Sequence, residues 1–251
     1  MTFLPTATIL TAAAFLLHPH AAAPDGTHVR EEINRSHRLV AGAEVRVSGV
    51  AGGVTIETID GDTAELRIVR SARTQAELDC YRTAVETSES RISIENVQSS
   101  DRAGCRNING YQEVRLRLPR RTDVRLSSIA GNVEIGALGG FVRLDSIAGT
   151  VSLAGTAGAE LTSIAGGLSV TDARPGARGI RIESIVGPVD LSFARNADAD
   201  VHVSSVNGRV ESVSPRLRTT GEDGDFHLKI GAGGPAVTIS SVMGPVRLRE
   251  Y

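Results

Sequence analysis

The sequence has almost no aromatic residues. Its 251 residues include 5 Phe, 3 Tyr and no Trp. Two of these rings, Phe3 and Phe15, lie in a hydrophobic N-terminal segment, so very few remain for the core of the rest of the chain. This scarcity argues against a globule packed around bulky anchors and against an aromatic platform for sugars or bases. A core must therefore be built from aliphatic side chains, within a hydrophobic fraction of 41%.

The chain also lacks an excess of charge of either sign. It has 27 Lys and Arg against 29 Asp and Glu, which gives a net charge of −2. Lys229 is the single lysine, so arginine supplies nearly all of the positive charge. A dedicated nucleic-acid-binding protein is normally strongly basic, and no nucleic-acid partner is expected here.

The N-terminal segment 1–23 lacks all four charged residue types. An apolar run from Ile9 to Leu17 is followed by Ala21, Ala22 and Ala23. This pattern is typical of a secretory signal peptide with a short hydrophobic region and a small-residue cleavage site. We therefore predict a signal peptide over 1–23 and export to the periplasm, the cell surface or the medium; the alternative is a buried N-terminal helix. The run is too short to span a bilayer comfortably, and no transmembrane anchor is expected.

Cysteine is nearly absent too, since only Cys80 and Cys105 occur. An even count in an exported chain predicts a disulfide, and the alternative is two free buried thiols. Two distant cysteines are too few for a metal site, and the histidines are scattered without a metal-ligand spacing. His202 and His227 are predicted to point outward from strands. No metal and no cofactor is predicted.

What the sequence does contain is an internal repeat. Six segments, beginning with 124–135 and ending with 237–248, share the pattern Ser-[Ile/Val]-x-Gly-x-[Val/Leu]. The conserved pattern positions are Ser128, Gly131, Ser146, Gly149, Ser163, Gly166, Ser184, Gly187, Ser205, Gly208, Ser241 and Gly244. An earlier copy over 45–56 has Gly49 in the Ser position and Gly52 in the Gly position, and a decayed copy fits 217–228 with Gly224.

Each repeat has two short stretches of alternating hydrophobicity separated by the glycine, which predicts two strands joined at a tight bend. One unit is too short to bury its own apolar face, so units must stack on one another. We therefore predict an all-β, single-domain parallel β-solenoid, similar to a β-helix, over 41–251. It would have about eight rungs, each one repeat unit, after a polar stretch over 24–40. One predicted inward column contains Leu126, Leu144, Leu161, Ile182, Val203 and Ile239.

The serine column is predicted to be structural. Its hydroxyls would bond to the turn backbone or to one another along the stack. The alternative, a row of catalytic serines, lacks a His or Asp at a fixed spacing, so no catalytic residue is predicted. On the outward side, Arg143, Glu160 and Arg181 are predicted to form ion pairs between rungs.

Residues 57–123 interrupt the repeat. Alternating patterns predict strands over 64–69, 91–94 and 113–118. The sequence from Thr74 to Glu77 has the form of a capping box, followed by Leu78, Tyr81 and Val85 at helical spacing. A helix is therefore predicted near 74–87, where it would cap the open end of the stack.

Arginines gather around Pro119 at the end of this insertion. They are Arg115, Arg117, Arg120, Arg121 and Arg125. Alternation is predicted to place them on one strand face, where they could contact an anionic surface polymer; the alternative is an ordinary solvated strand.

The repeats, the strand–helix–strand insertion and the segment Pro119-Arg120-Arg121-Thr122-Asp123-Val124 together resemble a bacterial family of β-strand-repeat envelope proteins called putative adhesins, a domain of unknown function. The resemblance covers roughly residues 40–251. It implies an envelope location and supplies no catalytic residues to transfer.

These observations favour a non-catalytic exported envelope protein, an adhesin-like binding or scaffold module. Its partner would be an unknown envelope protein or a cell-surface polymer. The alternative is an envelope-stress or regulatory protein that acts through a protein partner. A polysaccharide-active β-helix enzyme is disfavoured because clustered carboxylates at fixed spacing are missing.

Overall fold

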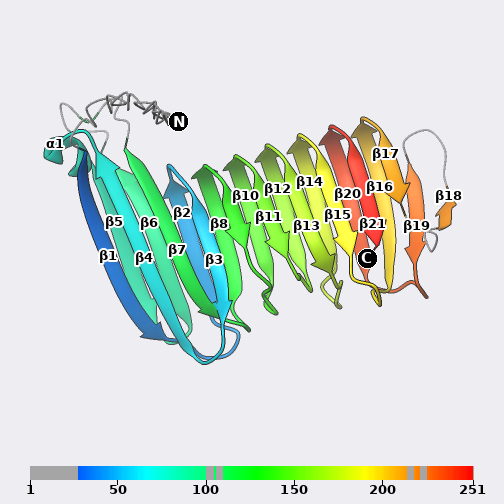
Figure 1. Ribbon diagram of the computed structural model, residues 1–251, viewed down its shortest axis with the longest axis horizontal. Helices are drawn as coiled ribbons and strands as arrows, with labels where there is room; N and C mark the ends of the chain where they lie inside the picture. Colours follow the sequence, from blue (N-terminus) through cyan, green and yellow to red (C-terminus); the bar gives the residue numbers. More distant parts are fainter. Residues whose placement is uncertain (1–27, 100–104, 106–109, 214–217, 221–224, 251) are drawn as a thin grey trace, which may run out of the picture.

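The fold is all-β. The structure is a computed structural model that describes residues 28–99, 105, 110–213, 218–220 and 225–250. The predicted signal peptide lies outside the described residues. The described strands form two large mixed sheets, and the described part contains one short helix (Figure 1).

The elements in chain order are β1 (Val29–Arg38), β2 (Glu44–Val50), β3 (Val54–Ile59), β4 (Thr63–Ala72), α1 (Gln75–Leu78), β5 (Tyr81–Ser88), β6 (Arg91–Gln98), β7 (Tyr111–Pro119), β8 (Asp123–Ala130), β9 (Val133–Ile135), β10 (Val142–Ala148), β11 (Val151–Ala154), β12 (Ala159–Ala165), β13 (Leu168–Ala173), β14 (Ile180–Val186), β15 (Val189–Phe193), β16 (Ala199–Asn207), β17 (Val210–Val213), β18 (Arg218–Thr220), β19 (Phe226–Ile230), β20 (Ala236–Met243) and β21 (Val246–Glu250).

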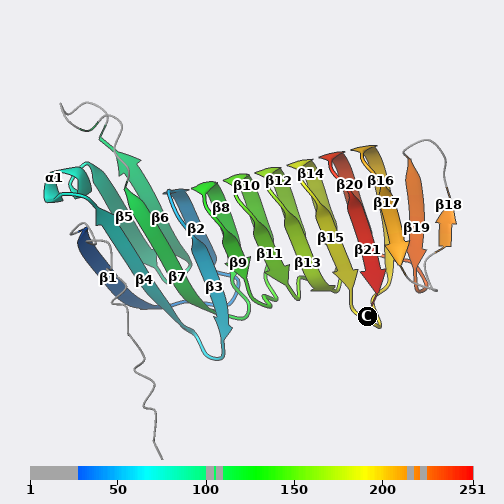
Figure 2. The same ribbon diagram turned by 45° about the horizontal axis from the view of Figure 1, so that its top comes forward.

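Each repeat places one strand in each sheet. Sheet A has ten strands in the order β1-β4-β7-β3-β9-β11-β13-β15-β21-β17, and sheet B has eleven in the order β18-β19-β16-β20-β14-β12-β10-β8-β2-β6-β5. In this spatial order, neighbouring strands pair in parallel from β7 to β17 in sheet A and from β16 to β6 in sheet B. The result is the elongated stack seen in both ribbon views (Figures 1 and 2).

The aliphatic core lies between the two sheets. The register places Leu126 beside Leu144, then Leu161, and continues through Ile182, Ile239 and Val203. All six side chains are fully buried, with 0% of their surface exposed. The predicted inward column is therefore confirmed, although its last two members lie in the reverse of their sequence order.

The repeats do not stack in chain order at the C-terminal end. The last repeat, with strands β20 and β21, lies between the repeat of β14 and β15 and the repeat of β16 and β17. The decayed copy over 217–228 does not form a parallel rung. Its described ends are β18 and the start of β19, which pair with each other in the antiparallel direction, and β19 also pairs antiparallel with β16.

At the other end of the stack, the strands are also not stacked in chain order. Strands β6 and β7 come from the insertion, yet they pair in parallel with β2 and β3 on the outer side of the first repeat. Their inward residues alternate as in a repeat; Ile92 and Ile94, and Val114 and Leu116, are almost completely buried. The insertion therefore extends the stack by one pair of strands, a role that its missing Ser-x-x-Gly pattern concealed.

The predicted helix near 74–87 is wrong in length. Its start is correct, because the Thr74 side chain accepts a hydrogen bond from the Glu77 amide at 3.2 Å, but α1 ends at Leu78. The next residues form β5, antiparallel to β6, with Val85 opposite Ile94. Thr83, Val85 and Thr87 are β-branched residues at alternate positions, a pattern that favours a strand.

Antiparallel strands, and not the helix, cover the end of the stack. Strand β4 pairs with β7, β1 pairs with β4, and β5 pairs with β6. Strand β1 lies in the stretch predicted to be polar, 24–40, and carries charged residues along most of its length. Charged side chains on an edge strand discourage pairing with another chain.

The serine position of the repeat is a left-handed corner. Ser128, Ser146 and Ser163 have φ of 54°, 58° and 54°, and their side chains are exposed. The corner shifts the alternation by one residue, so that Leu144 and Ile147 both point into the core although they lie three positions apart. Among the described residues these three hydroxyls make no hydrogen bond, so the predicted hydroxyl bonding is not found at these three positions. The side chains of Ser184, Ser205 and Ser241 lie outside the described part.

The glycine position is a point of close backbone contact. A Cβ on Gly131, Gly149, Gly166, Gly187, Gly208 or Gly244 would come within 2.2–2.3 Å of the carbonyl oxygen of a glycine in the adjacent repeat. The glycines therefore form a continuous ladder along the stack.

Candidate functional site

The predicted arginine cluster is divided between the two sheets. Arg115 and Arg117 lie on the outer face of β7 in sheet A, whereas Arg125 lies on β8 in sheet B. Arg120 and Arg121 occupy the turn between these strands. The prediction of one shared face is wrong because the chain passes from one sheet to the other at this turn.

Ion pairs hold three of these arginines. Arg115 lies 2.6 Å from Glu113, and Arg117 lies 2.7 Å from Glu65 and 3.7 Å from Glu57. Arg120 lies 3.4 Å from Asp60. These side chains are substantially exposed, so each pair contributes little to stability, roughly 0–1 kcal/mol.

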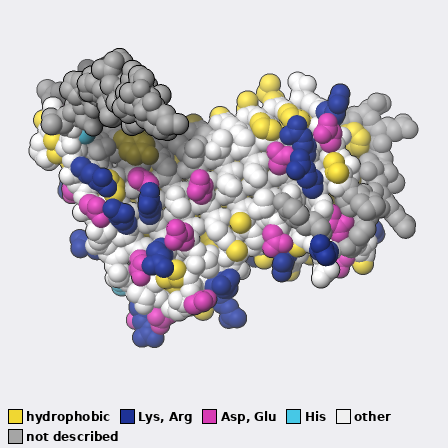
Figure 3. All heavy atoms as spheres, in the orientation of Figure 1, with side chains coloured by type: hydrophobic (Ala, Val, Ile, Leu, Met, Phe, Trp, Pro, Cys, Tyr) yellow, Lys and Arg dark blue, Asp and Glu magenta, His cyan; other side chains and the backbone are white. Residues whose placement is uncertain are grey.

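A groove lies on the outer face of β1, β4, β7 and β3; we call it the sheet A groove. Its volume is about 480 Å³, and its lining is Asn34, Arg35, Ser36, Thr55, Glu57, Glu65, Leu66, Arg67, Arg115, Leu116 and Arg117. Figure 3 shows basic and acidic side chains interspersed over the region where Figure 1 draws these strands. Two of the five predicted arginines therefore belong to a groove, together with Arg35 and Arg67.

The strand register explains how the groove is assembled. Arg67 on β4 lies opposite Arg115 on β7, and Thr55 on β3 lies on the other side of Arg115. Arg67 donates hydrogen bonds to both carboxylate oxygens of Glu32 on β1, the shorter at 2.9 Å. These bonds lower the pKa of Glu32 to about 2. Sequence analysis missed Arg35 and Arg67 because neither β1 nor the pairing of β4 with β7 was predicted.

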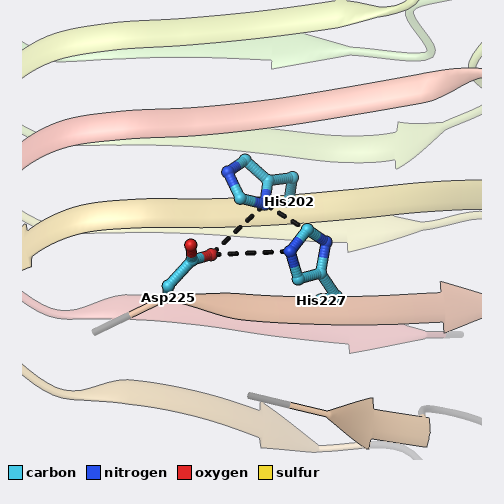
Figure 4. Close-up of side chains that lie close together, drawn as sticks. All are labelled: His202, Asp225 and His227. Carbon is cyan, nitrogen blue, oxygen red and sulfur yellow. Dashed lines mark hydrogen bonds and ion pairs between the residues drawn. The ribbon is translucent and has the colours of Figure 1, made fainter. Parts of the chain in front are cut away.

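A second cluster lies on sheet B at the other end of the stack. Strands β16 and β19 are antiparallel, and His202 on β16 lies directly opposite His227 on β19. Asp225 immediately precedes β19, and its carboxylate points toward both imidazoles (Figure 4). The Nδ1 atoms of the two histidines are 3.2 Å apart, and the Asp225 Oδ1 lies 3.4 Å from His202 Nδ1 and 3.6 Å from His227 Nε2.

Both histidines occupy outward strand positions, as predicted. They are 25 residues apart in the sequence, so no local spacing revealed that they meet. A neighbouring pocket of about 490 Å³ is lined by Asp200, Val201, His202, His227, Leu228, Lys229, Ala236 and Thr238. Lys229 Nζ lies 3.9 Å from Asp200 Oδ1 on its rim.

The predicted ion pairs between rungs are half correct. Arg143 and Glu160 pair at 2.5 Å, as predicted. Arg181 pairs instead with Glu183 on its own strand, also at 2.5 Å. The hydrogen bond from Arg181 to this glutamate, reinforced by its charge, raises the pKa of Arg181.

The predicted disulfide joins Cys80 and Cys105, whose Cα atoms are 5.5 Å apart. Both cysteines are buried and pack against Tyr81. The bond therefore fastens the segment after α1 to the loop between β6 and β7.

The exposed column serines show no catalytic arrangement in the described part of the chain. Ser128, Ser146 and Ser163 have no hydrogen bond to a histidine or carboxylate there. In the same ranges, no helix is long and apolar enough to cross a membrane, since α1 has four residues.

No protein-family model matches the chain, and no curated sequence is similar to it. Solved structures do resemble it. A putative cell adhesion protein from Clostridium sporogenes is 11% identical, with a TM-score of 0.46, and the match covers 88% of this chain and 100% of that protein. A putative adhesin from Bacteroides fragilis is 12% identical, with a TM-score of 0.31, over 88% of this chain and 97% of its own.

A putative adhesin from Parabacteroides merdae is 11% identical, with a TM-score of 0.29, over 88% of this chain and 96% of that protein. These three neighbours are named as adhesion proteins. We base the functional proposal on the residues of this chain alone.

Proposed function

We propose that the protein is a non-catalytic binding module of the bacterial envelope, exported to the periplasm or the cell surface. Its paired strands would form a parallel β-solenoid of about eight rungs that serves as a rigid scaffold. The alternation of successive repeat strands between the parallel parts of the two mixed sheets supports this interpretation. The Cys80–Cys105 disulfide agrees with an oxidising compartment outside the cytoplasm.

The sheet A groove is the proposed binding surface. Four arginines and two glutamates line it. Two further glutamates, Glu32 and Glu113, form ion pairs with Arg67 and Arg115 at its edges. A guanidinium presents a planar pair of donors that matches a carboxylate or phosphate. We therefore propose that the groove binds an anionic segment of a cell-surface polymer.

The ion pairs of the groove are weak enough for an arginine to exchange its glutamate partner for an anionic group of the polymer. Arg117 and Glu65 are about half exposed, with 52% and 48% of their side-chain surface accessible. Breaking such a pair costs little, and a polymer carboxylate then takes the place of the glutamate. The groove spans four neighbouring strands at the surface, which suits an extended chain better than an enclosed small molecule.

The test is binding of polygalacturonate, an anionic polysaccharide, with neutral dextran as the comparison. We expect the protein to bind the anionic polymer at low salt, more weakly at high salt, and not to bind dextran. Arg117→Gln and Arg67→Gln each remove a charged hydrogen-bond donor and should weaken binding about tenfold.

Arg125→Gln is the matched control, because Arg125 belongs to the predicted set but lies on sheet B. Equal weakening by Arg125→Gln, or no binding by the unaltered protein, would overturn the groove assignment. Polymer length is measured after prolonged incubation. An unchanged length supports a non-catalytic role, whereas shortening contradicts it.

A further inference from the structure

The cluster of His202, Asp225 and His227 has a chemical character that the polymer-binding proposal leaves unexplained. Two imidazoles and one carboxylate converge on one point of the surface, each from the end of sheet B (Figure 4). One donor atom from each residue lies within 4.8 Å of the other two. An ordinary surface ion pair would need only one histidine and one carboxylate.

We propose that these three residues bind one divalent transition-metal ion of the Zn²⁺ type. Imidazole nitrogen and carboxylate oxygen are the donors that Zn²⁺ and its neighbours in the first transition row prefer. Ca²⁺ and Mg²⁺ take oxygen ligands almost exclusively, so two histidines select against them.

The distances between donors fit a single ion. With bonds of about 2.0–2.1 Å, two ligands of a tetrahedral Zn²⁺ lie about 3.4 Å apart. The two Nδ1 atoms are 3.2 Å apart, and His202 Nδ1 and Asp225 Oδ1 are 3.4 Å apart. Two edges of the required triangle are therefore already close to the spacing that the ion would impose.

The backbone holds both histidines in this arrangement. His202 and His227 face each other in one antiparallel register, between the pairs Val201–Leu228 and Val203–Phe226. Val201, Val203 and Leu228 are buried, with 2%, 0% and 3% of their surface exposed. Core packing on the inner face thus fixes the strands, and binding requires only small side-chain adjustments.

An ion would have access and a free coordination position. The side chains of His202, Asp225 and His227 are 36%, 60% and 63% exposed. Three protein ligands leave a tetrahedral ion with a fourth position for water or another donor. The pocket of about 490 Å³ beside the histidines gives room for that fourth ligand.

The ion would have a structural consequence. His227 belongs to the antiparallel strand β19 and Asp225 immediately precedes it, whereas His202 belongs to β16 at the end of the parallel stack. A bound ion would fasten β19 to the stack, and ligand binding to the folded state alone stabilises that state.

The test is titration of the untagged protein with Zn²⁺, followed by competition with a chromophoric chelator, and with Co²⁺, followed by its visible absorption. We expect one strongly bound ion per chain and the intense absorption of tetrahedral Co²⁺. His202→Gln, His227→Gln and Asp225→Asn should each weaken binding by at least about tenfold. His28→Gln, which alters an exposed histidine next to β1 at the opposite end of the stack, should leave binding unchanged.

Thermal unfolding supplies a second measurement. Zn²⁺ should raise the Tm of the unaltered protein and of His28→Gln, and leave the Tm of the His202→Gln, His227→Gln double variant unchanged. Far-UV circular dichroism checks that the variants fold. Absence of Zn²⁺ binding by the unaltered protein, or equal binding by the folded double variant, would overturn the proposal. Polygalacturonate binding should be the same in the His202, His227 and Asp225 variants, because the sheet A groove lies at the opposite end of the stack.

Discussion

Gly166 packs directly against Gly149 of the adjacent repeat: a Cβ on Gly166 would lie 2.2 Å from the carbonyl oxygen of Gly149. A real side chain cannot approach a carbonyl oxygen so closely. Any residue with a Cβ at this position would therefore force a change in the strand spacing or in the backbone of the corner. The same contact recurs from Gly131 to Gly244, which makes glycine a requirement of stacking at these positions.

Gly166→Ala should lower the free energy of unfolding by about 2–4 kcal/mol, because it combines overlap with a neighbouring backbone and an unfavourable φ of +150°. Denaturant unfolding measures the change. Gly61→Ala is the matched control, since Gly61 also has a positive φ, +104°, but no atom lies within 4 Å of its Cβ position. That variant should cost only about 1 kcal/mol. Similar losses in the two variants would contradict the ladder.

Substitutions at Ser163 test whether the left-handed backbone conformation of the corner determines stability there. The φ of 54° at Ser163 is unfavourable for residues with a Cβ, and Gly49 occupies the equivalent position with a φ of 72°. Ser163→Gly should therefore leave stability within about 1 kcal/mol, because relief of the strain offsets the greater freedom of the unfolded chain. Ser163→Val should lose about 1–2 kcal/mol, since a β-branched residue tolerates this conformation poorly. If both variants lost the same amount, the hydroxyl and not the backbone would be responsible.

The core columns could be predicted from sequence because alternation alone decides which residues point inward. Leu144 and Leu161 fit this rule, and the structure places them side by side. The stacking order could not be predicted in this way. Ile239 and Val203 are interchangeable as members of one aliphatic column, so the column does not reveal which repeat lies next to which.

The candidate sites depend on the stacking order and the strand pairing, which the hydrophobic alternation does not reveal. His202 meets His227 because β19 runs antiparallel to β16, a pairing that follows from the complete topology. The pattern of 217–228 instead suggested another parallel repeat. Likewise, the alternation of Arg115, Arg117 and Arg125 is real, but it does not show that the chain changes sheets after Pro119.

The disulfide should contribute to stability. It closes a sequence separation of 25 residues, for which the chain-entropy estimate is about 3.5 kcal/mol. The Cys80→Ser, Cys105→Ser variant should therefore unfold at a lower denaturant concentration. In the unaltered protein, alkylation should add mass only after reduction. Alkylation of the unreduced, denatured protein would show that the bond is absent.

The intercalated last repeat makes Leu248 an interior core residue. Strand β21 lies between β15 and β17, and Leu248 is 0% exposed. Leu248→Ala should cost about 2–5 kcal/mol, the range for a large-to-small change in a packed core. Val213→Ala, on the terminal strand β17 with Val213 62% exposed, should change stability by less than about 0.5 kcal/mol. A small effect at Leu248 would contradict the stacking order.

The Glu32–Arg67 pair predicts a distinct response to acid. Hydrogen bonds from Arg67 and Asn34 lower the pKa of Glu32 from 4.5 to about 2. Because the folded-state pKa lies below the unfolded value, the stabilisation by this ion pair is complete above about pH 4.5 and is lost as the pH falls through about 2. NMR titration of the Glu32 carboxyl group measures this directly.

Arg67→Gln should return the pKa of Glu32 toward its ordinary value, because it removes the strongest hydrogen bond and the nearest positive charge. Arg125→Gln, on sheet B, should leave the pKa of Glu32 unchanged. A normal pKa in the unaltered protein would mean that β1 does not hold Glu32 against β4 in solution. Strand β1, which forms one edge of the sheet A groove, would then be out of place. The titration therefore also tests whether the proposed polymer-binding surface is assembled.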